Sequence, residues 1–453
     1  PVTVYRTETV VVDLVEYGRR LGVEVIPVAT VHEALQIFTA GAYTAPAPTG
    51  PSPVRSPLVE QRVRGWVDTL KATLWSVVSQ GDSIKDAALG TLPRYARARV
   101  EGLVAEMEGY ARSLADRAEA LYAQGFYYSA ATAYFQALTY SLWRLYLLRG
   151  LGDAGSLDGV RESIGSRVRA VIASVHSLLA NASVTCVELL DVAIAVLDRA
   201  YEALIFLNRS ATETSMDRAT YYLALADSRA ITAELWGDLF EAVSLPGGTC
   251  CQVSEGYIES AVELLEGMIY NIYMYVVSFE GSVSIPSDTL GEMVARMNLL
   301  RDSENPVDRL SLGVGALAYG YATLVEMFSQ DINSTAEVLV RSIGTELASE
   351  TLKGCPLVSP ALYMELQSTQ EASISRVYTL SRVAALVSFY ADSLRVGVGY
   401  TTPTAEWTGP AERTVTLTLT EPRVVHPEQG YAPTVYVALG ALLGVLLTVT
   451  VLL

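Results

Sequence analysis

Four cysteines are the residues of this chain best suited to specific chemistry, either as disulfides or as metal ligands. Cys250 and Cys251 are adjacent, and Cys186 and Cys355 lie well before and after them. Adjacent cysteines rarely bond to each other, so we predict that Cys186 and Cys355 are each joined to one of the adjacent pair. The spacing leaves both ways of pairing open, and it also allows four reduced, buried thiols.

A metal site is not expected. Zinc sites use cysteine and histidine ligands at short, regular spacings. The sequence has no C-x-x-C motif, and its three histidines, His32, His176 and His426, are scattered. We therefore predict no metal and no cofactor.

Three N-x-S/T sequons give candidate glycosylation sites at Asn181, Asn208 and Asn333. One sequon by itself is a weak signal, because the motif arises by chance in a chain of this length. Three sequons together with disulfide-forming cysteines favour a domain outside the cell, on the oxidising side of a membrane.

The sequence assigns no catalytic residue. The chain has only three lysines, Lys71, Lys85 and Lys353, and nothing near Lys71 or Lys85 marks either one as an activated base. A set of serine, histidine and aspartate could be chosen from any chain of this size, so we draw none.

Composition indicates a folded protein that does not bind nucleic acid. Of 453 residues, 51% are hydrophobic and 18% are charged, which is typical of folded domains. The net charge of −17 disfavours nucleic acid as a partner, because phosphate binding needs a basic face. Nearly all the positive charge is arginine, which we interpret as compositional bias and not as a site.

The end of the sequence predicts a membrane anchor over residues 431–453. Val435–Leu453 contains no charged residue, and nineteen helical residues span about 28 Å, close to the hydrocarbon thickness of a bilayer. Gly440 and Gly444 form a G-x-x-x-G motif through which two such helices could pack. We expect a single-pass protein of the cell membrane with its N-terminal body outside. No signal peptide is present, so we also expect a processed or trimmed product.

The rest of the chain predicts a mainly α-helical fold. Residues 1–40 have a short α/β pattern, including a strand over Val23–Val28, and 41–57 are a proline-rich linker. From 58 to 398 the pattern is that of a large helical bundle, with apolar residues at helical spacing and breaks at glycine and proline. Residues 399–430 form a loop and β stalk, with an alternating strand near 413–420.

Two parts of the helical region are more specific. The apolar residues from 59 to 77 step by three and four, as Val59, Val63, Trp66, Leu70, Leu74 and Val77. The stretch near 111–149 resembles a tetratricopeptide hairpin, with Gly125 at the turn between helices and Tyr127, Ala130, Tyr134 and Ala137 at packing positions. No second copy occurs at a fixed period, and an ordinary alanine- and tyrosine-rich helical pair explains this stretch equally well.

The stretch from Val12 to Leu35 reads VDLVEYGRRLGVEVIPVATVHEAL. It resembles the end of the proteolytic domain of Lon-type proteases, in which a helix, a G-V-x-V-x-P-V strand and a T-x-x-E-A-L helix close the domain. The most similar proteins are the secreted, membrane-bound archaeal Lon-like serine proteases. In that family a helical region and a C-terminal membrane span follow the proteolytic domain, and this chain has the same layout.

The resemblance implies an ATP-independent serine protease with a Ser-Lys dyad, but both dyad residues precede this stretch in the family. Gly50-Pro51-Ser52 matches the family's serine turn in composition, yet it lies in the linker after the domain's end, so no catalytic residue is carried over. We therefore expect the anchored helical part of a cell-surface Lon-like protease. Expected partners are the bilayer, an upstream protease domain or cleaved N-terminal chain, and further copies or other surface proteins. The alternative is a non-catalytic scaffold protein of the cell envelope.

Overall fold

The computed structural model describes residues 13–28, 31–42, 56–153, 155–181, 186–243, 253, 255–279, 284–328, 357–370, 377–379, 381–383 and 385–386. The chain divides into two compact units, one made of Pro1–Pro46 with Tyr400–Leu453 and the other of Ala47–Gly399. The predicted stalk, the strand near 413–420 and the membrane helix at 431–453 lie outside the described residues and stay predictions.

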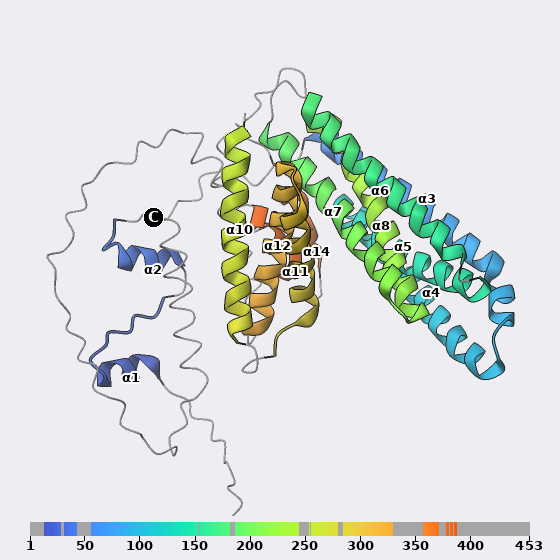
Figure 1. The fold of residues 1–453 in the computed structure, drawn as a ribbon, viewed down its shortest axis with the longest axis horizontal. Helices are drawn as coiled ribbons and strands as arrows, with labels where there is room; N and C mark the ends of the chain where they lie inside the picture. The colour runs from blue at the N-terminus through green and yellow to red at the C-terminus, as the bar shows by residue number, and fades with distance from the viewer. Residues whose placement is uncertain are drawn as a thin grey trace, which may run out of the picture. The chain divides into compact units, whose positions relative to one another are not determined.

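The described part of the first unit contains two short helices, α1 (Leu14–Arg20) and α2 (Val31–Phe38) (Figure 1). Asp13 caps α1, since its carboxylate accepts a hydrogen bond from the Val15 amide at 2.9 Å. Gly22, with a φ of +73°, adopts the left-handed conformation just after the helix.

The strand expected over Val23–Val28 is not formed, and the α/β character predicted for this segment is not supported. The residues are not helical, but no strand is assigned anywhere in the described part of the chain. A strand is held by ladder hydrogen bonds to a neighbour. Here Val25 instead lies against Gly18, where any β-carbon would collide with it.

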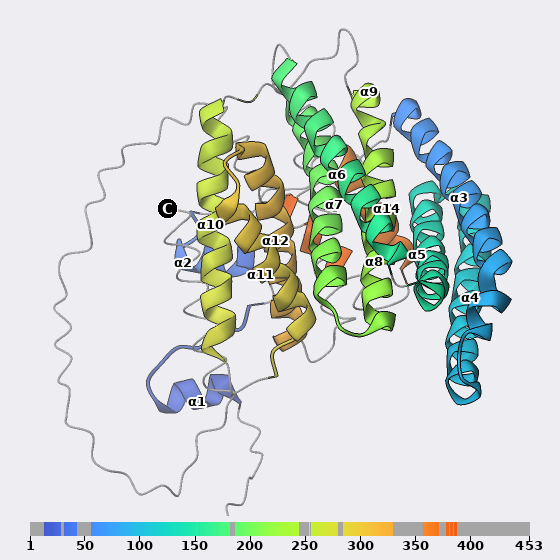
Figure 2. The same ribbon diagram turned by 45° about the vertical axis from the view of Figure 1, so that its right-hand side comes forward.

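The described residues of the second unit form an α-helical bundle, as predicted (Figures 1 and 2). Its helices are α3 (Pro57–Gly90), α4 (Arg94–Ala123), α5 (Tyr127–Gly152), α6 (Ser156–Asn181), α7 (Val187–Thr212), α8 (Met216–Gly237), α9 (Leu239–Val243), α10 (Glu255–Ser278), α11 (Ser287–Asp302), α12 (Pro306–Phe328) and α14 (Val358–Thr369).

Helix α3 follows directly from the local sequence. Ser56 accepts a hydrogen bond from the Val59 amide at 3.2 Å and Pro57 occupies the first turn, so the helix begins at the end of the predicted linker. All six residues of the predicted apolar stripe are buried, with Val63 completely shielded from solvent. The stripe faces α5, against which α3 packs.

Helices α5 and α7 form the centre of the bundle. Helix α5 packs against α3, α4 and α8, and α7 packs against α6, α8 and α12. Both are buried around most of their circumference, and for α5 this explains why the sequence shows little amphipathic pattern. Helices α3, α8, α12 and α14, which also line the candidate site, each contact one or both of these two.

The predicted hairpin corresponds to α4 and α5, which pack against each other. Gly125 lies in the turn with a φ of +85°, and Ala130, Tyr134 and Ala137 are buried as expected, whereas Tyr127 is only partly buried. The two helices have 30 and 26 residues, whereas a whole tetratricopeptide repeat has about 34. The pair is therefore much longer than one such repeat.

Helix α12 is long and apolar enough to cross a membrane by length and composition. However, 72% of its most apolar window is buried inside the structure, where it packs against α7, α10 and α11. Gly313, Gly315 and Gly320 let these neighbours approach closely. This burial is typical of a core helix, and the predicted anchor is a different segment.

Candidate ligand-binding site

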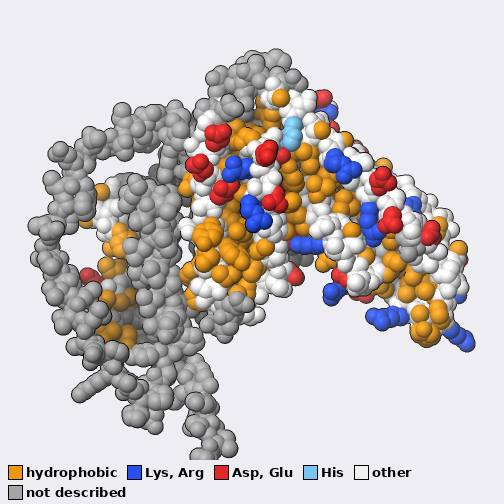
Figure 3. Space-filling view, viewed as in Figure 1, with side chains coloured by type: hydrophobic (Ala, Val, Ile, Leu, Met, Phe, Trp, Pro, Cys, Tyr) orange, Lys and Arg blue, Asp and Glu red, His pale blue; other side chains and the backbone are white. Residues whose placement is uncertain are grey.

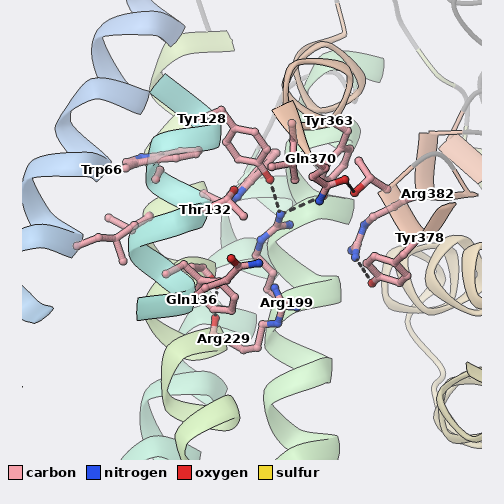
Figure 4. Close-up of a pocket in the computed structure, with 18 of the residues that line it drawn as sticks. Trp66, Tyr128, Thr132, Gln136, Arg199, Arg229, Tyr363, Gln370, Tyr378 and Arg382 are labelled. Carbon is pink, nitrogen blue, oxygen red and sulfur yellow. Dashed lines mark hydrogen bonds between the residues drawn. The ribbon is translucent and has the colours of Figure 1, made fainter. Parts of the chain in front are cut away.

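A cavity of about 330 Å³ lies inside the helical bundle. Its wall brings together Trp66 from α3, Tyr128 from α5, Arg199 from α7, Trp236 from α8 and Tyr363 from α14 (Figure 4). The volume is at the lower end of the range for small-molecule sites, and a mostly apolar wall with a few convergent polar groups is typical of them.

Arg199 is at the centre of this wall. Its guanidinium donates hydrogen bonds to the hydroxyl of Tyr128 at 3.3 Å and to that of Tyr363 at 3.0 Å (Figure 4). It also donates a hydrogen bond to the carbonyl of Ala195 at 2.7 Å. It also lies 4.1 Å from the ring centre of Trp236, a cation–π contact. No ion pair to Arg199 occurs within the described part of the chain, although its side chain is only 5% exposed.

The other arginines of the wall are neutralised by a buried acidic pair. Nε of Arg229 lies 2.7 Å from Oε2 of Glu202, and Arg382 forms an ion pair with Asp198. Arg296, beneath the cavity, bridges both acids, at 3.6 Å from Asp198 and 3.4 Å from Glu202. The two carboxylates are thus shared among three guanidinium groups.

Burial and charge act in opposite directions on these groups. Burial by itself raises the pKa of Glu202, but the adjacent guanidinium groups of Arg229 and Arg296 outweigh it and hold the pKa below its usual range. Burial lowers the pKa of Arg382 to about 10. Both groups therefore remain charged at neutral pH.

Aromatic rings form the apolar part of the wall. The ring centres of Trp66 and Trp236 are 5.5 Å apart, Tyr128 meets Trp236 edge-on at 5.8 Å, and Tyr363 stacks with Trp236 at 5.9 Å. Such packing fixes the side chains before any ligand arrives.

Hydrogen-bond donors remain unused at the wall. The indole Nε1 of Trp66 is buried without a hydrogen-bond partner. The hydroxyls of Tyr128 and Tyr363 accept from Arg199, so each must direct its own hydrogen elsewhere, and no acceptor for either is found among the described residues. A buried donor without an acceptor is costly unless a water or ligand satisfies it.

The sequence prediction missed this site because it treated arginine as compositional bias. One local signal was present. In α7 the stretch from Val187 to Phe206 is strongly apolar, yet it contains Asp198, Arg199 and Glu202. Charged residues within an apolar helix are buried and must be paired or functional.

Of the predicted disulfide residues, only Cys186 is described. It is disulfide-bonded at the start of α7, and its partner lies outside the described residues, as do Cys250, Cys251 and Cys355. The predicted pairing of Cys186 with one of the two adjacent cysteines stays a prediction.

The three predicted glycosylation sequons differ in where they lie in the structure. Asn208 is exposed on α7, but Ser210 of the same sequon is buried beside Arg161, whose Nε lies 3.2 Å from its hydroxyl. Asn181 is the last residue of α6. Asn333 lies outside the described residues, as do Gly440 and Gly444 of the predicted membrane helix.

The two described lysines are not arranged as catalytic bases. Lys71 forms an ion pair with Glu119, and Nζ of Lys85 lies 2.8 Å from Glu108. A Ser-Lys dyad needs a lysine that meets a serine hydroxyl. Neither Lys71 nor Lys85 has a hydrogen bond to a serine hydroxyl among the described residues.

Two exposed apolar surfaces accompany the cavity. In the first unit Leu21, Ile26 and Phe38 are 63%, 47% and 68% exposed. In the second unit hydrophobic side chains gather over α10, where Tyr270 and Met274 are exposed (Figure 3). Exposed apolar side chains that gather on one face, as those over α10 do, are typical of a binding surface (Figure 3).

Comparisons of the chain with protein-family models, curated proteins and solved structures gave no match.

Proposed function

We propose that this chain is the membrane-anchored, non-catalytic part of a cell-surface Lon-like protease, and that its helical unit receives substrate. The proteolytic domain, with its Ser-Lys dyad, would precede the stretch that resembles the end of such a domain. The proposal rests on one structural observation together with that resemblance.

The observation is the exposed apolar surface of the first unit. Leu21 and Ile26 belong to the stretch that resembles the closing elements of the family's proteolytic domain, Phe38 ends the helix α2 that begins in this stretch, and all three are exposed. Leaving an apolar side chain of this size in water, instead of burying it, forgoes about 1.5–3 kcal/mol. A proteolytic domain packed on this surface would recover that energy.

The properties of the helical unit suit a binding role and not a catalytic one. Its two described lysines are held by glutamates, as Lys71 with Glu119 and Lys85 with Glu108. Its cavity is lined by rigid aromatic rings and arginine, a combination that binds and orients but offers no evident nucleophile.

Cleavage of casein without ATP tests the proposal. The protein is purified from its native membranes with antibodies against the helical unit, and activity is measured before and after substitution of the serine of the preceding dyad. We expect cleavage that is lost in the serine variant. If the purified protein cleaves no casein and no Ser-Lys dyad precedes residue 1, the protease assignment is refuted. The alternative, a non-catalytic scaffold protein of the cell envelope, then remains.

A further inference from the structure

We propose that the cavity binds the C-terminal end of a polypeptide, holding its carboxylate against Arg199 and its last apolar side chain against the aromatic rings. This inference deepens the proposed function, on which it rests, by naming the part of a substrate that the helical unit recognises. It depends on the charge, the unused donors and the shape of the wall.

The charges of the wall fit a single negative group. Arg229 and Arg382 have carboxylate partners in Glu202 and Asp198. Arg199 has none among the described residues and instead contacts two phenols and a carbonyl. One buried guanidinium without an acid calls for one negative charge. A carboxylate supplies it, whereas a phosphate monoester brings nearly two.

The donors of the wall fit an oxygen acceptor. The hydroxyl groups of Tyr128 and Tyr363 are held next to Arg199 by the hydrogen bonds that their oxygens accept, and neither has an acceptor for its own hydrogen among the described residues. Both side chains are at most 5% exposed. A carboxylate has two oxygens and about four acceptor positions, so it can satisfy several donors together.

The rest of the wall fits an apolar side chain attached to that carboxylate. Trp66 and Trp236 lie beside each other at 5.5 Å, and Leu70, Leu235 and Leu366 also line the cavity. A carboxylate directly next to an apolar group is the chemistry of a chain ending in a residue such as leucine or phenylalanine. An aspartate or glutamate inside a chain has no apolar side chain next to its carboxylate. The chain would also continue on both sides of that residue, and the cavity of about 330 Å³ would have to hold both continuations.

One acid opposes this ligand. Glu326 lines the cavity, where it accepts a hydrogen bond from Thr289 at 3.3 Å, and burial raises its pKa above the usual range. Its negative charge repels an incoming carboxylate. Removing that charge should therefore strengthen binding, an effect that a purely structural cavity would not show.

Binding is measured on the full chain with a pentapeptide that ends in phenylalanine, by titration calorimetry and by tryptophan fluorescence. The same peptide with an amidated end, and 3-phenylpropanoate, serve as comparison ligands. We expect the amide to bind at least about tenfold more weakly, as expected for loss of hydrogen bonds to a charged group. Equal affinity for the acid and the amide, or no binding of the acid at 1 mM, overturns the proposal. Equal affinity for 3-phenylpropanoate and the peptide overturns the polypeptide assignment.

Variants separate recognition from folding. Y128F keeps the ring and removes only a hydroxyl, so we expect affinity to fall about fivefold to tenfold. R199M should abolish most of the preference for acid over amide, and E326Q should raise affinity. Y140F, outside the cavity, is the matched control and should change nothing. If Y128F and R199M melt at the same temperature as the parent protein and bind the peptide acid with unaltered affinity, the proposed site is refuted.

The outcomes distinguish this inference from the proposed function. A protein that cleaves casein but shows no preference for the free carboxylate refutes the cavity's role alone. A protein that binds the peptide but cleaves nothing refutes the protease alone.

Discussion

Replacing Asp191 by alanine should destabilise the helical unit strongly, because this one carboxylate holds the start of α14. Asp191 lies on α7 and is fully buried. It accepts hydrogen bonds from the amides of Val358 and Ser359, both at 2.8 Å, and from the Ser359 hydroxyl. It therefore caps the N-terminus of a helix more than 160 residues away in the sequence.

The magnitude follows from these bonds. A hydrogen bond to a charged group contributes about 1.5–3 kcal/mol, and a buried amide left without an acceptor costs about 1–3 kcal/mol. Since the three bonds are not additive, we expect D191A to lower the free energy of unfolding by about 3–5 kcal/mol. Because α14 also carries Tyr363, the cavity should weaken together with it.

Urea unfolding followed by circular dichroism measures the effect. With an m value of about 3 kcal/mol/M, a loss of 4 kcal/mol lowers the midpoint by about 1.3 M. The control is D302A, which removes an exposed aspartate at the C-terminal end of α11 and should change stability by less than about 0.5 kcal/mol. A midpoint in D191A within 0.3 M (about 1 kcal/mol) of the parent value refutes the capping role.

The remaining predictions concern two glycines and Glu202 in helices of the second unit and are measured by thermal or urea unfolding. G291A should stabilise the protein by about 0.5–1 kcal/mol, because a β-carbon at this helical position meets nothing. G315A should instead cost about 2–3 kcal/mol, since its β-carbon would lie 2.7 Å from Asp198 and 2.9 Å from Arg296; a neutral or stabilising result contradicts this. E202Q should lower the free energy of unfolding by about 3–5 kcal/mol at pH 7, because it leaves buried guanidinium groups without a charged partner. The pKa of Glu202 is lower in the folded protein than the value of about 4.3 for glutamate in the unfolded chain. The ionised carboxylate therefore stabilises the fold above about pH 4.3, and this stabilisation is lost as the pH falls through the folded pKa. The free energies of unfolding of the parent protein and E202Q should therefore converge in acid. A constant difference between pH 7 and pH 3 contradicts the ion-pair argument.

Helices and their ends could be predicted because they depend on neighbouring residues. The stripe through α3 was correct since a spacing of three and four puts its members on one face. Breaks were expected at glycine and proline, and α5 ends at Gly152, α11 begins directly after Pro286 and α12 begins at Pro306. In the last case Asn305 caps the helix, accepting from the Val307 amide at 2.9 Å. The strand at 23–28 failed because a strand also needs a partner.

What the sequence by itself determined is therefore the helical class, the positions of many helix ends and the acidic, lysine-poor character of the chain. Only the tertiary structure decided the cavity. Trp66, Arg199 and Tyr363 are separated by more than a hundred residues each, and their helices meet only through packing on α5 and α7. Periodicity reports which face of a helix is buried, but not which other helix covers it. Whether a buried arginine is paired with an acid or left for a ligand depends on that choice of neighbour.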